Sequence, residues 1–345
     1  MARAAIGQIC SSNSMASNLA QCVKLVGRAA DAGAKILFLP EASDYIGTSA
    51  QESLSLARPV ASSPFVTGLQ AAAARHSIAV HVGIHVPVAV RPVGASGRRE
   101  EETPPPAKNN PVVSSVPRSE KEDASASGDA ASTKLYNRTI YIVPDGAVLP
   151  SGSYDKLHLF DYAALRESAS TQAGARLIPP IPSPVGRLGS LICFDLRFPE
   201  PALRLTRAPA PGTGPGPAQV LLYPSAFTVP TGRAHWEVLL RSRAIETQSY
   251  VIAAAQVGAH NIDAATANGK RPRVSYGHSM VVDPWGRVIL QMKGVRPDWD
   301  GGDAEDAVEP GAVGELGVVD IDLEEWERVR EKMPLIRRTD VYPEI

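Results

Sequence analysis

Three residues of types that can cleave an amide bond each accompany a short apolar run. Glu41 follows the run 36–39, and Cys193 follows residues 189–192. Lys156 lies within residues 153–160, which contain Leu157, Leu159 and Phe160. A cysteine at a strand-to-helix turn is a typical nucleophile, because free N–H groups at a helix start favour its thiolate. Three alternatives stay open: a buried apolar role for Cys193, a helix cap or loop end for Glu41, and a surface position for Lys156.

Amide cleavage requires an activated nucleophile, a stabilised oxyanion and an acid for the departing nitrogen. Cys193 would attack the carbonyl carbon, and Glu41 would accept the thiol proton and then deliver it to the leaving amine. The Lys156 ammonium and the backbone N–H of Phe194 would hold the oxyanion. A water molecule activated by Glu41 would then hydrolyse the thioester.

The chain order of Glu41, Lys156 and Cys193, with their neighbours, resembles the catalytic triad of the nitrilase superfamily. Further resemblance lies in residues 223–227, 235–248 and 276–286, and it is greatest with the branch that contains deaminated glutathione amidase. The resemblance implies an α/β fold, a four-layer αββα sandwich, and hydrolysis of a small carboxylate-bearing amide, deaminated glutathione. It also implies that Glu167 lies beside the lysine, where the alternative is an exposed loop position.

Other functions are consistent with the same residues. An omega-amidase acting on 2-oxoglutaramate is the second interpretation within the superfamily, and a catalytically silent binding or scaffold protein of the same fold is a third. A papain-like pairing of Cys193 with His158, His235 or His278 ranks lower, because no Asn or Asp accompanies a histidine in a recognisable motif. His235 and His278 are predicted to be structural hydrogen-bonding groups.

A substrate carboxylate calls for a guanidinium group. Arg197 is the first candidate because it follows Cys193 by about one helical turn, and Arg243 is the second; either could instead form a structural salt bridge. The other predicted substrate-binding residues are Phe194, Tyr45, Ser225, Phe227 and Thr231.

Composition excludes several functional classes. A formal net charge of −1 leaves no basic field for nucleic acid, and three cysteines are too few for a disulfide framework or a zinc site. Without phosphate-binding glycine motifs or metal-ligand spacing, we predict no cofactor and no metal. No long apolar run indicates a signal peptide or membrane contact, which favours the cytoplasm; Arg3 and Arg28 among Ala and Ser leave a mitochondrial pool open.

Strands and helices alternate along residues 1–345, which predicts one α/β domain. The predicted helix over 235–247 carries more apolar residues than one core-facing stripe needs, which favours a homodimer through this helix. These apolar residues are Trp236, Val238, Leu239, Leu240, Ala244 and Ile245.

Residues 91–133 are rich in Pro, Ser and Ala and predict a disordered insertion between two strands. We expect deletion of this segment to leave amidase activity and melting temperature nearly unchanged, because loop length affects stability only logarithmically. Thermal unfolding and release of the amine from the amide substrate would measure both effects. A loss of several kcal/mol, or of activity, would show that the segment packs against the domain.

Overall fold

The computed structural model describes residues 1–90, 132–162, 165–207, 214–338 and 340–342. Nearly all of the predicted insertion therefore lies outside the described residues; only Ser132 and Thr133 are seen, and they begin strand β4 (Ser132–Ile142). Contacts between Cα atoms divide the chain into Ala89–Thr133 and a larger unit, Met1–Val88 with Lys134–Ile345. The larger unit contains the elements that position the candidate site.

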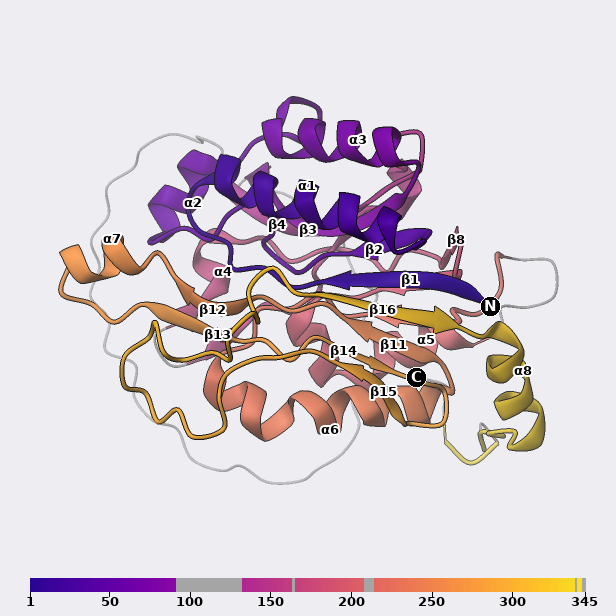
Figure 1. The fold of residues 1–345 in the computed structure, drawn as a ribbon. Coiled ribbons are helices and arrows are strands. Elements are labelled where there is room, and N and C mark those ends of the chain that lie inside the picture. Colours follow the sequence, from indigo (N-terminus) through magenta and orange to yellow (C-terminus); the bar gives the residue numbers. More distant parts are fainter. Residues whose placement is uncertain (91–131, 163–164, 208–213, 339, 343–345) are drawn as a thin grey trace, which may run out of the picture. The chain divides into compact units, whose positions relative to one another are not determined.

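Two mixed sheets of six strands form the centre of the larger unit (Figure 1). The first has the order β16 (Leu316–Ile321), β1 (Ala2–Gly7), β2 (Ile36–Phe38), β3 (Ala79–Val90), β4 and β5 (Tyr154–Asp155). The second has the order β15 (Val288–Gln291), β14 (Met280–Val282), β11 (Tyr250–Ala253), β10 (Val220–Leu222), β9 (Gly186–Ser190) and β8 (Ile181–Ser183). Two short ribbons are β6 (Asp161–Tyr162) with β7 (Leu165–Arg166), and β12 (Val257–His260) with β13 (Arg273–Tyr276).

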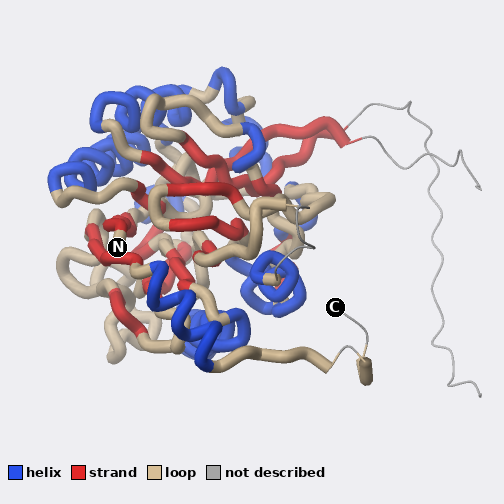
Figure 2. Tube along the Cα trace, turned by 90° about the vertical axis from the view of Figure 1, so that its right-hand side faces the viewer, coloured by secondary structure: helices blue, strands red, loops and turns tan. Residues whose placement is uncertain are grey.

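Helices cover the outer faces of both sheets. Figure 2 shows helices in blue outside the red strands of the sheets. The α-helices are α1 (Met15–Asp31), α2 (Ala50–Leu56), α3 (Pro64–His76), α4 (Glu167–Ser170), α5 (Pro199–Thr206), α6 (Val229–Thr247), α7 (Ile262–Ala267) and α8 (Leu323–Lys332). Single 3₁₀ turns are η1 (Val60–Ser62), η2 (Pro150–Gly152) and η3 (Cys193–Arg197).

Alternating side chains on the strands build three apolar layers. On β2, Leu37 packs against helices α1 and α3, whereas Ile36 and Phe38 face the second sheet. On β10, Leu222 faces the first sheet while Leu221 packs beneath α5 and α6. Because side chains alternate with a period of two, each strand is apolar on both faces, as a doubly covered sheet requires. The predicted αββα sandwich is confirmed.

Most predicted elements are present, with local corrections. The helix expected from 235 begins earlier, at Val229, where Pro230 is tolerated because the first helical N–H groups need no intrahelical partner. The turn after Cys193 is 3₁₀ rather than α-helical, and α5 starts separately at Pro199. Within the described ranges, no helix is both long and apolar enough to cross a membrane.

Candidate active site

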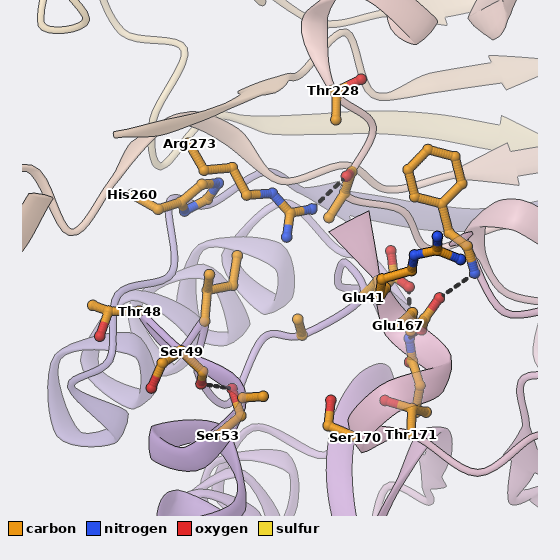
Figure 3. A pocket seen from close by; sticks show the side chains of 18 of the residues that line it. Glu41, Thr48, Ser49, Ser53, Glu167, Ser170, Thr171, Thr228, His260 and Arg273 are labelled. Carbon is orange, nitrogen blue, oxygen red and sulfur yellow. Dashed lines mark hydrogen bonds between the residues drawn. The ribbon is translucent and has the colours of Figure 1, made fainter. Parts of the chain in front are cut away.

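Strands from both sheets bring Glu41, Lys156 and Cys193 together. Glu41 lies three residues after β2, Lys156 directly follows β5, and Cys193 lies three residues after β9. All three side chains are almost fully buried, with residue exposures of 5%, 2% and 9%. Figure 3 shows Glu41 and Glu167 side by side at one end of a cavity. The structure thus places the four predicted catalytic residues in one cluster.

Hydrogen bonds join the polar members of this cluster. Lys156 Nζ donates to Glu41 Oε1 at 3.0 Å and to Glu167 Oε2 at 2.9 Å. Asn137 Nδ2 donates to both carboxylates, at 2.7 Å to Glu41 and 3.1 Å to Glu167. The backbone N–H of Phe160 donates to Glu167 Oε2 at 2.7 Å. Such partners are what make burial of two carboxylates tolerable.

The same contacts set the charge states of the cluster. Burial alone would raise the pKa of Glu41, but the Lys156 ammonium and hydrogen bonds from Cys193 and Asn137 outweigh it, so this pKa is below its ordinary value. Burial would lower the pKa of Lys156, yet Glu167 and Glu41 hold it well above its usual range. Glu41 is therefore a carboxylate and Lys156 an ammonium at neutral pH.

The thiol has the opposite tendency from the one expected at a helix start. Burial, and then the Glu41 carboxylate, raise the pKa of Cys193 well above its ordinary value, and Lys156 offsets this only in part. The resting group is therefore a thiol that donates a hydrogen bond to Glu41. Attack on a carbonyl requires the thiolate, and the Glu41 carboxylate lies where it could accept the thiol proton.

The elbow, defined here as residues 189–197, holds Cys193 in a left-handed conformation with φ of 44°. Its backbone N–H donates to Pro224 O at 3.0 Å, and the backbone N–H of Ala226 hydrogen bonds to its thiol. A non-glycine residue at positive φ costs roughly 1–2 kcal/mol. Two anchored neighbours hold the thiol at the cavity wall in spite of that cost.

The backbone around Glu41 is constrained in the same way. Ala42, the next residue, has φ of 55°. Gln256 Nε2 donates to the carbonyls of Glu41 at 3.0 Å and Ala42 at 3.2 Å. At Gly83 a Cβ atom would lie 2.6 Å from Glu41 Cα, so only glycine allows this approach. Position 83 thus determines how closely β3 supports the carboxylate.

Asp195 is a further member of the site that sequence reasoning overlooked. This fully buried carboxylate accepts hydrogen bonds from the backbone N–H of Ile192 at 3.0 Å and the hydroxyl of Tyr154 at 2.8 Å. Its other oxygen accepts from the backbone N–H of His158 at 3.0 Å and contacts His158 Nδ1 at 2.7 Å. Asp195 therefore ties the segment that carries Lys156 to the elbow.

In Asp195→Asn the new amide NH₂ would face two donors at either oxygen position. The elbow and the segment that carries Lys156 would then lose their connection, so we expect kcat to fall with little change in KM. The free energy of unfolding should fall by about 2–5 kcal/mol, from two buried polar groups left without acceptors. Tyr154→Phe is the matched control, since it removes one donor and should cost less. Chemical denaturation and steady-state kinetics measure both; unchanged kcat in a folded Asp195→Asn protein would contradict the positioning role.

Asp195 and Asp44 also correct the expectation that no acidic residue accompanies a histidine. Asp44 Oδ1 lies 3.0 Å from His85 Nδ1, and His85 lines the cavity. Burial would lower the pKa of His85, but Asp44 raises it overall, with smaller contributions from Glu41 and Glu167. Neither pair is a papain-like dyad, because Cys193 hydrogen bonds to Glu41. A sequence signal existed for His158: it lies two residues from Lys156.

A cavity of about 920 Å³ opens from the cluster. Four of the predicted substrate-binding residues line it: Phe194, Arg197, Phe227 and Thr231. Tyr45 and Ser225 lie outside this lining; both are fully buried and donate to the carbonyls of Ser53 and Tyr223. Arg243 is structural, with bonds to Glu246 and Leu196 O.

The cavity lining is strongly basic. It contains six Lys or Arg residues but only two carboxylates, and Lys156 binds both carboxylates. Within the described residues, the other five basic side chains form no salt bridge with a carboxylate: Arg166, Arg197, Lys270, Arg271 and Arg273. Arg197 instead donates to His235 Nδ1 at 2.6 Å. The cavity therefore suits an anionic ligand.

Metal-binding geometry is a separate question. Among the residues that the structure describes, no three His, Cys, Asp or Glu side chains are grouped so that they could hold a metal ion. All three cysteines have free thiols.

Known proteins resemble this chain along nearly its whole length. A family model described as carbon-nitrogen hydrolase matches residues 3–89 and 106–331. The Schizosaccharomyces pombe protein named "Probable hydrolase nit2" is 37% identical and covers 100% of both chains. Deaminated glutathione amidase of Mus musculus is 34% identical over 98% of this chain and 84% of its own. The crystal structure of the C. elegans NitFhit protein is 33% identical, with a TM-score of 0.71 over 99% of this chain and 67% of that chain.

Proposed function

Because this chain belongs to the carbon-nitrogen hydrolase family and is an amidase of the nitrilase superfamily, we propose that Glu41, Lys156 and Cys193 cleave the amide bond of deaminated glutathione. The observation that carries the chemistry is the buried cluster in which Cys193 and Lys156 both hydrogen bond to Glu41. Glu167 accepts a hydrogen bond from the lysine and so holds it in place.

The proposed reaction has two halves. Glu41 takes the thiol proton of Cys193 while sulfur attacks the carbonyl carbon, and Lys156 with the Phe194 N–H stabilises the oxyanion. The carbon–nitrogen bond then breaks as Glu41 returns the proton to the leaving amine. Water attacks the thioester and gives a proton to Glu41, the carbon–sulfur bond breaks, and the proton restores the thiol. The products are a carboxylate and an amine.

The cavity supports deaminated glutathione over smaller amides. This compound has a carboxylate at each end, one on the oxoacyl half and one on the cysteinylglycine half. A cavity of about 920 Å³ whose lining has five basic side chains that form no salt bridge with a carboxylate in the described chain has room and charge for both. The alternative substrate, 2-oxoglutaramate, has a single carboxylate and releases ammonia. The relatives named deaminated glutathione amidase add support.

Steady-state kinetics on the two amides test the substrate assignment. We expect kcat/KM to be higher for deaminated glutathione, with cysteinylglycine released in equal amount to 2-oxoglutarate. A kcat/KM several-fold higher for 2-oxoglutaramate would favour the omega-amidase. If neither amide is hydrolysed and Cys193→Ala keeps every cellular phenotype, the scaffold interpretation replaces the enzyme.

A homodimer through α6 is a further part of the proposal. Trp236 and Leu240 are buried in the core, but Val238 is 59% exposed and Ile245 47% exposed on the same helix, and Trp285 near Ile245 is 55% exposed. A second copy of this chain, related by a two-fold axis, would bury this apolar surface against itself.

We expect light scattering at micromolar concentration to give twice the 36.5 kDa chain mass. Ile245→Glu should lower the measured mass toward that of the monomer, because a carboxylate would be buried at the two-fold interface. Glu327→Lys, an exposed charge reversal on α8 rather than α6, is the control. A wild-type monomer would refute the dimer.

We also propose a reducing compartment, the cytoplasm, with a mitochondrial pool as the alternative. Support comes from the three free thiols, since Cys193 must stay reduced to react. Fractionation of cells followed by detection of the chain would distinguish the two compartments.

A further inference from the structure

Arg273 occupies a distinctive position in the cavity. It is the first residue of β13 and pairs with His260 on β12. Figure 3 shows its side chain extending into the cavity, between His260 on one side and Glu41 with Glu167 on the other. Its guanidinium is close enough to His260 to help lower the pKa of that imidazole, for which burial is the main cause. The cation thus lies within the cavity, between its buried and outer ends.

A single backbone residue separates this guanidinium from the nucleophile. Arg273 Nη2 donates to Ala226 O at 2.8 Å, and the N–H of the same Ala226 hydrogen bonds to the thiol of Cys193. Among the described residues the Arg273 side chain forms no other hydrogen bond and no salt bridge. The guanidinium is therefore fixed at one nitrogen, and its remaining N–H donors are available to a ligand.

The shape of the cavity indicates which half of a substrate would meet those donors. The end that holds Glu41, Lys156 and Cys193 is buried. An outer lobe, lined by Thr48, Ser49, Ser53, Asn261 and Asn268, continues on the other side. In Figure 3, Thr48, Ser49 and Ser53 lie on the far side of the cavity from Glu41 and Glu167. A dipeptide attached to the scissile nitrogen that extends from the buried end toward this lobe would pass Arg273.

Arg197 is placed to serve the other half. It belongs to the same 3₁₀ turn as Cys193, and His235 orients its guanidinium. A five-carbon oxoacyl group bound as a thioester to Cys193 would keep its carboxylate near this turn. The two guanidinium groups thus come from different elements and correspond to the two carboxylates of the proposed substrate.

We propose that Arg273 binds the carboxylate of the leaving half, the terminal carboxylate of cysteinylglycine, and so selects amides with an acidic dipeptide-like amine over simple amides. This inference rests on the proposed function. Arginine is suited to this role because its planar fork can donate two parallel hydrogen bonds to a carboxylate.

Kinetics of Arg273→Gln on three amides test the assignment: deaminated glutathione, its C-terminal glycinamide form, and 2-oxoglutaramate. We expect KM for deaminated glutathione to rise about tenfold to a hundredfold, the loss typical of a charge-assisted pair. The fold-decrease in kcat/KM should be at least about tenfold larger for deaminated glutathione than for the other two amides, because neither has a carboxylate on the leaving half. Arg273→Lys, which keeps the charge, should recover part of the loss.

Arg75→Gln is the matched control. It removes an equal charge from the exposed end of α3, and Arg75 lies outside the cavity lining. Equal losses in Arg75→Gln and Arg273→Gln, or equal losses of Arg273→Gln on all three amides, would overturn the proposal. Wild-type protein inactive on deaminated glutathione would overturn the proposed function together with this inference. An active wild type with an unselective Arg273→Gln loss would overturn only the inference.

Discussion

Cys193→Ala should lower amidase activity by about 10⁴-fold or more, because no other group in the described cavity lining can form the thioester. The backbone of the elbow is held by Pro224 O and does not depend on the sulfur atom. The variant should therefore fold with a melting temperature close to that of the wild type. Release of amine from deaminated glutathione, together with thermal unfolding, measures both effects.

Mass spectrometry of the quenched reaction sharpens this test. The wild-type protein should carry an oxoacyl adduct on the peptide that contains Cys193, and Cys193→Ala should carry none. Cys10→Ala is the control: its thiol is partly buried, contacts Ala259 O and lies outside the cavity lining. This control should keep both activity and adduct. An adduct on Cys10 or Cys22 instead of Cys193 would refute the assigned nucleophile.

Lys156→Met should be the most damaging substitution for both activity and stability. It leaves Glu41 and Glu167 facing each other in a buried site with only Asn137 between them. Removing one member of a buried ionic cluster typically costs about 3–5 kcal/mol, because the remaining charge is uncompensated. Loss of an oxyanion donor should lower kcat by about 10²–10³-fold in whatever protein folds.

The stability of this variant should depend on pH in a direction opposite to that of the wild type. In the wild type the pKa of Glu41 is lowered, so its contribution to stability is lost as pH falls through that pKa. Without the lysine, the two carboxylates repel and at least one pKa rises above its unfolded value. Protonation of that carboxylate then stabilises the variant as pH falls. The difference in free energy of unfolding between wild type and variant therefore becomes smaller.

Urea unfolding at pH 7 and pH 5 measures this gap. Lys156→Met combined with Glu41→Gln is the matched control, since it removes the repulsion without restoring activity. That double variant should recover part of the lost stability and show little of the pH dependence. A gap that widens at pH 5 would contradict the ionic role of Lys156.

Sequence reasoning located Glu41, Lys156 and Cys193 for a physical reason. Each accompanies a short apolar strand, and a sandwich of two sheets brings the ends of such strands together. Chain order and local motif were sufficient because strand ends are positioned by the fold as a whole. Tyr45 and Ser225 lie outside the cavity lining, because nearness in sequence does not determine which way a side chain points.

The partners of the triad could not be predicted in the same way. Asn137 lies on β4, and its contact with Glu41 depends on the order of strands within the first sheet. Asp195 joins β5 and β9, which belong to different sheets. Arg273 reaches the cavity only through the β12–β13 pairing. Such contacts depend on register and packing, which local residue patterns do not specify.

The left-handed backbone at Ala42 and Cys193 has an evolutionary consequence. Glycine at either position would relieve this backbone strain, so we expect selection for the proposed catalysis to keep a cysteine at 193. A descendant released from that selection should drift first at these two sites, toward glycine or asparagine, while its sheets stay intact. Related chains that have lost catalytic activity should therefore show substitutions at the positions equivalent to 42 and 193 before their core residues change.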